Sequence, residues 1–236
     1  NLAYWFFEFE LTEEADRWAS RCYTMAPQTA VCRRIQLQQA RVYGDDKLRL
    51  QLARNMLEED ISVRRFGFAG ALFSFADLMQ DQGRAREAYD FLAEKYPALL
   101  TPEIPPNGLK DSLVRRAGIE LMLDFAPREQ AIEAMELWVR HWEEARRDTY
   151  DEWEERMWVH LVKGETSQAA EIALTDDLSR PLSDNIRWKS RYTHDPMRRV
   201  LADIPEVAAR LRELDKEMAI LRSEVQQMLM SREWQQ

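Results

Sequence analysis

Apolar residues between positions 70 and 97 are spaced with the period of a helix, not with that of a strand. They form one helical face on either side of a turn: Leu72, Phe75, Ala76 and Met79, then Ala88, Leu92 and Ala93. Gly83 lies between the two segments, and Gly readily adopts the left-handed conformation that ends a helix. Pro97 ends the second segment. The pattern predicts two antiparallel helices that pack on each other through their apolar faces.

Similar segments recur along the chain. The apolar positions predict further repeat helices at residues 13–27, 30–58, 109–143 and 148–173. The predicted turns within the hairpins are 39, 44 and 37 residues apart, at Gly44, Gly83, Pro127 and Gly164. Such uneven spacing predicts divergent repeats rather than a regular array.

These segments resemble tetratricopeptide (TPR) repeats. Ala76 and Ala88 match the two small positions where paired helices cross, and Trp153 takes the position of the repeat's Trp in a later copy. Segment 30–58 is the weakest match because Arg49 stands where Ala is expected. The resemblance implies an all-α fold, a TPR-like right-handed α-solenoid of antiparallel helix hairpins with a long C-terminal capping helix.

In this interpretation the repeats occupy residues 1–177, a connector follows at 178–202, and the last helix spans 203–236. Residues 1–9 match only the tail of a repeat helix, so the first repeat is truncated and we expect the chain to begin inside a larger protein. The polar connector contains Asp195-Pro196, which predicts a turn before a new helix.

The last predicted helix carries an apolar stripe with alternating spacings of three and four residues: Leu211, Leu214, Met218, Leu221, Val225 and Met228. Such a stripe either covers the end of the solenoid or forms the seam of a homodimer. We favour the cap, because the ends of solenoids need one.

Charge and motifs exclude several classes of function. The net charge of -9 argues against direct contact with nucleic acid, which requires a basic surface. The longest uncharged runs have eleven residues, against about 20 for a membrane-spanning helix. The sequence has no glycine-rich phosphate loop, nucleophile elbow, HExxH or CxxC motif, and its three histidines are dispersed. We therefore expect no catalytic residues, cofactor or metal.

Binding residues are harder to assign. Trp142, Arg146 and Tyr150 would form an anchor for a peptide if Trp142 were partly exposed, although a stripe of Trp is more often core. Paired arginines, including Arg115-Arg116, either lie on solvated helix faces or line the concave groove and bind acidic groups. We name Trp142, Arg146, Tyr150 and Arg115 as candidate partner-binding residues.

Cys22 and Cys32 lie five residues on either side of Pro27, near the facing ends of two predicted helices. A disulfide between them would place the chain in an oxidising compartment such as a periplasm, whereas two buried thiols would fit a reduced cytoplasm. Both alternatives stay open at this point.

The order of these elements is similar to that in the C-terminal regions of bacterial multidomain signalling proteins: divergent repeats, then a connector, then a charged last helix. These include membrane-spanning winged-helix regulators, whose solenoid is an extracytoplasmic sensor, and cyclase-linked or kinase-linked TPR proteins. The similarity implies a protein-binding or peptide-binding sensor or scaffold in a signalling or transcription-regulatory protein. The alternative is a module that oligomerises an upstream effector domain through its last helix.

Overall fold

A computed structural model describes residues 2–59, 66–145, 152–182 and 187–231. Within these ranges Phe66, Trp142, Ala145, Glu152 and Ser190 are described by their backbone alone. The described residues form helices and their connections and contain no strand, so the predicted all-α class is confirmed.

Ten helices are joined pairwise by short turns: α1 (Leu2–Glu8) with α2 (Thr12–Met25), α3 (Ala30–Val42) with α4 (Asp46–Glu58), α5 (Phe66–Asp81) with α6 (Ala85–Lys95), α7 (Leu109–Phe125) with α8 (Arg128–Ala145), and α9 (Glu152–Lys163) with α10 (Thr166–Ile172). A 3-10 turn, η1 (Pro97–Leu99), follows α6, and a π-helical turn, η2 (Ala173–Asp177), extends α10. Three further helices complete the described chain: α11 (Trp188–His194), α12 (Pro196–Arg199) and α13 (Pro205–Met230).

The turn residues end their helices as the sequence predicts. Gly44, Gly83 and Gly164 have φ angles of 67°, 68° and 78°, a left-handed conformation that other residues rarely adopt. Between α7 and α8 no Gly is needed, because Ala126 is extended ahead of Pro127. In these four hairpins the backbone conformation of the turn residues ends the first helix.

Small residues are buried where the paired helices meet. Ala76 and Ala88 belong to one apolar core shared by α4, α5, α6 and α7. Trp138 and Trp158 meet edge to face at 5.1 Å in a neighbouring core, and Trp153 is buried in the core of the C-terminal helices. All three are buried, which is the core position that the sequence favours for a stripe of Trp.

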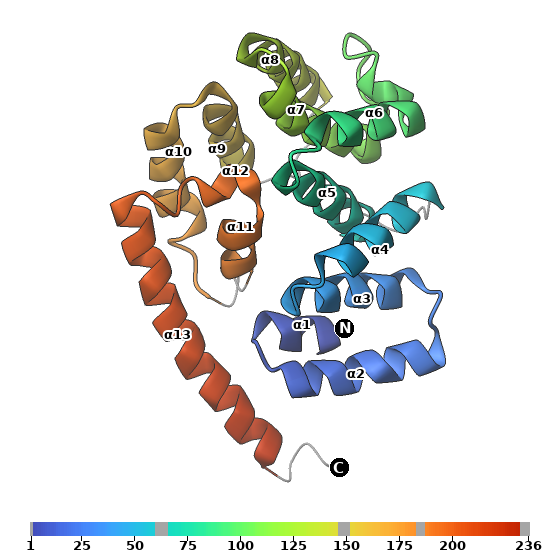
Figure 1. Ribbon diagram of the computed structural model, residues 1–236. Coiled ribbons are helices and arrows are strands. Elements are labelled where there is room, and N and C mark those ends of the chain that lie inside the picture. Colours follow the sequence, from blue (N-terminus) through green and yellow to red (C-terminus); the bar gives the residue numbers. More distant parts are fainter. Residues whose placement is uncertain (1, 60–65, 146–151, 183–186, 232–236) are drawn as a thin grey trace.

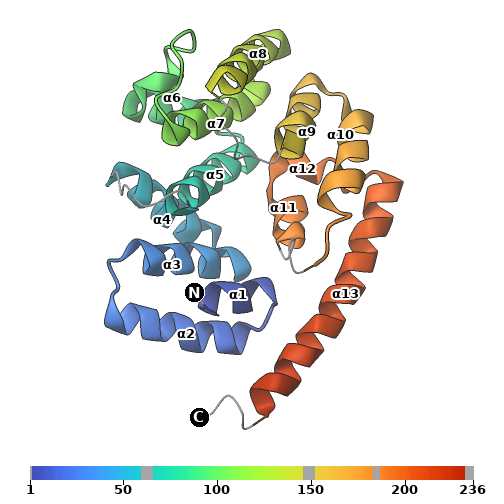
Figure 2. The same cartoon turned by 180° about the vertical axis from the view of Figure 1, so that it is seen from behind.

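The hairpins from α1–α2 to α7–α8 follow one another in chain order from one end of the molecule to the other, and α9 to α12 lie along one side of them (Figure 1). Helix α13 then runs back toward the level of α2, as the view from behind also shows (Figure 2). The two ends of the described chain therefore approach each other, and α11 faces the N-terminal hairpins.

The connector is more structured than its polar sequence indicates. Residues 188–194 form α11 and residues 196–199 form α12, and Trp188 and Tyr192 are buried in the core that also contains Leu178 and Leu214. Two aromatic residues four positions apart share one face of a short helix, and that face is apolar. This segment is packed structure rather than a solvated linker.

The apolar stripe of α13 faces its own chain. Leu214 and Met218 are buried, and Leu211 packs against the same C-terminal core. Val225 packs against the N-terminal core of α1–α3, whereas Met228 is 51% exposed. This is the arrangement expected of a cap, with the stripe covering two cores of one chain.

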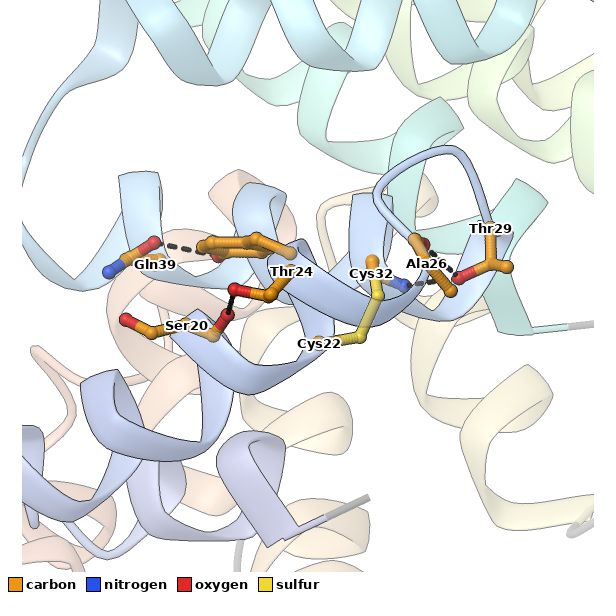
Figure 3. The surroundings of a disulfide bond; sticks show 8 residues. Ser20, Cys22, Thr24, Ala26, Thr29, Cys32 and Gln39 are labelled. Carbon is orange, nitrogen blue, oxygen red and sulfur yellow. Dashed lines mark hydrogen bonds between the residues drawn. A yellow bond between two sulfur atoms is a disulfide. The ribbon is translucent and has the colours of Figure 1, made fainter.

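Cys22 of α2 and Cys32 of α3 form a disulfide, with their Cα atoms 5.7 Å apart (Figure 3). The turn between them is fixed by Thr29, whose hydroxyl donates to the Ala26 carbonyl at 2.9 Å and accepts from the Cys32 amide at 3.4 Å. The bond closes a short loop, and its effect on the unfolded chain is correspondingly limited.

Reduction of this disulfide is expected to lower the free energy of unfolding by about 2 to 3 kcal/mol, because a small loop gains conformational freedom in the unfolded state. Urea denaturation with and without dithiothreitol measures the difference. A Cys22→Ala/Cys32→Ala variant serves as the control, since its transition should not respond to the reductant. Identical transitions for the oxidised and reduced wild-type protein would contradict the prediction.

Candidate functional site

A cavity of about 270 Å³ lies between the N-terminal hairpins and α11. We call it the arginine pocket, and its charged lining residues are Arg34, Arg41, Arg49, Asp77, Arg187, Arg191 and Asp195. Five guanidinium groups thus face two carboxylates in a chain whose net charge is -9. Arginine is therefore the most frequent charged residue in the lining of the pocket.

The pocket is built by helical faces that are polar where a core face would be apolar. From α3, Arg34, Gln38 and Arg41 line it at i, i+4 and i+7. From α5, Gly70, Ser74 and Asp77 line it at the same spacing, and a Cβ atom added to Gly70 would have no neighbour within 4 Å. The glycine therefore leaves open space in the wall.

Arg49 is the most deeply buried of the pocket arginines. It is 5% exposed, its Nη2 atom lies 4.0 Å from Asp77 Oδ2, and its Nε has no hydrogen-bond partner. Burial lowers the pKa of its guanidinium. A buried cation with an unused donor is costly unless a negative group completes its contacts.

Two other titratable groups that line the pocket have shifted pKa values. Burial raises the pKa of Asp77, and the neighbouring carboxylates of Asp195 and Glu120 raise it further. Burial and the charges of Arg41 and Arg49 lower the pKa of His194 to about 4, so this imidazole is neutral at pH 7. Burial contributes to both shifts; nearby carboxylates add to that of Asp77, and nearby arginines add to that of His194.

Tyr4 of α1 forms an aromatic floor. The guanidinium carbon of Arg34 lies 4.3 Å from the ring centroid, and that of Arg187 lies 4.8 Å from it. Cations stack favourably on aromatic faces, and the ring orients both planar groups. Behind the wall, Glu8 accepts from Arg41 at 3.1 Å and Asp177 from Arg191 at 3.1 Å, which fixes these two side chains.

Of the four binding residues predicted from the sequence, the structure describes the side chain of Arg115, which does not line the arginine pocket. Arg115 is 4% exposed, and its guanidinium donates to the carbonyls of Ala98, Thr101, Pro102 and Ile104. It holds the loop after η1 instead of facing a partner, because its donors are used by the backbone. Arg146 and Tyr150 lie outside the described residues, as does the side chain of Trp142.

Two further observations concern the described chain. In the ranges that the structure covers, no group of three or more His, Cys, Asp or Glu residues is arranged to hold a metal ion. Among the helices described, none combines the length and the apolar character needed to cross a membrane.

Comparison of the sequence with protein-family models, with curated proteins and with solved structures gave no match. The similarity to tetratricopeptide repeats therefore rests on the residues of this chain and stays a prediction.

Proposed function

We propose that this chain is a non-catalytic, TPR-like recognition module that binds an acidic segment of a protein or peptide in the arginine pocket. In this proposal it serves as the sensor or scaffold part of a larger bacterial signalling or transcription-regulatory protein. The observation that carries the proposal is Arg49, a buried guanidinium with an unused Nε donor in the wall of a cationic pocket.

The chemistry of the pocket favours a carboxylate as the recognised group. Guanidinium groups donate in pairs to carboxylate oxygens, and such charge-assisted hydrogen bonds are about twice as strong as neutral ones. The remaining acidic surface of the chain would repel an acidic segment that binds elsewhere. Self-association through α13 is less well supported, because the stripe that would form the seam packs within the chain.

The test measures binding of acetyl-penta-glutamate with a free C-terminus by isothermal titration calorimetry. Replacing Arg49 by Gln is expected to weaken binding at least about tenfold, since removing one partner of a desolvated charge pair costs about 2 kcal/mol or more. Arg84→Gln is the matched control, because Arg84 is exposed and pairs with Glu87 on α6.

Two results would overturn the proposal. The first is no binding of the peptide by the wild-type protein. The second is equal binding by wild type and Arg49→Gln, with both proteins giving the same circular dichroism spectrum.

A further inference from the structure

Gly70 lies inside helix α5 without the features that explain other glycines of this chain. The turn glycines have positive φ angles, and a Cβ atom added to Gly118 would lie only 2.2 Å from Leu99 Cδ1. The φ angle of Gly70 is not positive, and its added Cβ atom would have no neighbour within 4 Å among the described residues. Neither backbone conformation nor close packing therefore requires a glycine here, although Gly weakens the interior of a helix relative to Ala.

The open space at Gly70 belongs to the apolar part of the arginine pocket. Leu37 of α3 and Ala69 and Phe73 of α5 also line the pocket. Leu37 belongs to the apolar core of α4–α7, and Phe73 packs against that core. A ligand that extends beyond the guanidinium groups therefore meets an apolar surface beside Gly70.

The unused donor of Arg49 lies about one helical turn from this space. Arg49 is 5% exposed, and its Nε has no hydrogen-bond partner among the described residues. Its Nη2 donates to Ser74 Oγ at 3.4 Å, and Ser74 follows Gly70 by four residues on α5. Such residues are about 5 to 6 Å apart on one helix face. Two adjacent groups of one ligand can therefore reach Arg49 and the space at Gly70 together.

The volume of the pocket exceeds what one carboxylate needs. It is about 270 Å³, whereas a cavity of about 150 Å³ is enough to hold a benzene molecule. The pocket has room for an acidic group and an apolar side chain at the same time.

We propose that Gly70 determines which acidic segments the arginine pocket accepts, because it leaves space for an apolar side chain next to the acidic residue. This inference rests on the proposed function, which supplies the acidic segment. The preferred partner is then a peptide in which a residue such as Leu neighbours Glu or Asp. The apolar side chain gains affinity by leaving water, whereas a polar side chain would lose its hydration in the same place.

Isothermal titration calorimetry with two peptides of equal charge tests the inference: acetyl-Glu-Glu-Leu-Glu-Glu and acetyl-Glu-Glu-Gln-Glu-Glu. We expect the wild-type protein to bind the Leu peptide at least about fivefold more tightly, because an apolar side chain is buried. In Gly70→Leu the new side chain occupies the space, so the two affinities should be equal. Leu is a better helix former than Gly, so this variant keeps α5, which circular dichroism checks. The control is Gln51→Leu, at an exposed position of α4 outside the pocket lining, and it should keep the preference of wild type.

Two results would overturn the inference and leave the proposed function standing. One is equal binding of the two peptides by wild type, and the other is a preference for the Leu peptide that persists in Gly70→Leu. Arg49→Gln separates the two proposals, because it should weaken binding of both peptides and keep the preference. If Arg49→Gln binds both peptides as tightly as wild type while Gly70→Leu removes the preference, the role of Gly70 stands and the proposed function is wrong. Binding of neither peptide by wild type would overturn both.

Discussion

Replacing Glu154 by Gln is expected to lower the free energy of unfolding by about 3 kcal/mol, as is typical when one partner of a buried ion pair is removed. Glu154 of α9 accepts from Arg198 of α12 at 2.6 Å and from Arg116 of α7 at 3.4 Å. Arg198 is buried, so Gln would leave its charge less well compensated. Urea denaturation at pH 7 measures the loss.

The same substitution has a defined pH dependence. Burial raises the pKa of Glu154, but the charges of Arg198 and Arg116 outweigh burial and lower it to about 2. A carboxyl group with a lowered pKa stabilises the fold above its unfolded pKa of about 4.3, and this contribution is lost as the pH falls toward 2. The difference in the free energy of unfolding between wild type and Glu154→Gln should therefore be largest near pH 6 to 7. It should become smaller below about pH 4.3.

The matched control is Glu171→Gln, at an exposed position on the neighbouring helix α10. It is expected to change stability by less than about 0.5 kcal/mol. Two results would show that the ion pairs of Glu154 do not stabilise the fold as described. One is a loss of stability for Glu154→Gln that is no larger than that of the control, and the other is an equal loss at pH 7 and at pH 3.

The hairpins could be predicted from the sequence because their determinants are local. The spacing of Leu72, Phe75 and Ala76 sets one helix face, and Gly83 ends the helix within a few residues of that face. Neither property depends on distant parts of the chain. The handedness and superhelical geometry of TPR repeats are tertiary properties, and they stay a prediction.

The arginine pocket could not be predicted, because it joins residues from both ends of the chain. Arg34 and Arg187 meet over Tyr4, although 153 positions separate them. One local signal was present: Arg49 departs from the repeat pattern at a position where a small residue is expected. Such conflicts between a local rule and the global fold are expected at functional or strained sites.

The connector shows a second limit of the sequence interpretation. Its polar composition predicted a linker, and that interpretation missed the buried side chains of Trp188 and Tyr192. A seven-residue helix offers too few positions for a periodic pattern to stand out. Its burial is decided by α9, α10 and α13, which supply the other side of the core.

Replacing Leu214 by Asn is expected to lower the free energy of unfolding by about 4 kcal/mol, because it removes a buried side chain and buries an amide in its place. Leu214 is 0% exposed in the core that it shares with Trp188 and Leu201. The same substitution distinguishes the two uses of α13. If α13 is a cap, the variant is less stable and its molecular mass in solution is unchanged. If α13 forms the seam of a dimer, the variant dissociates into folded monomers.

Urea denaturation together with sedimentation equilibrium over a hundredfold range of concentration separates these outcomes. Ile220→Asn is the control, because Ile220 lies on the same helix and is 63% exposed. If α13 is a cap, we expect a large loss of stability for Leu214→Asn and a small change for Ile220→Asn. The wild type and both variants should then have the mass of a monomer. A wild-type dimer that Leu214→Asn converts to a stable monomer would show instead that α13 exchanges its intramolecular contacts for those of a second chain, because the same apolar stripe cannot cover both surfaces at once.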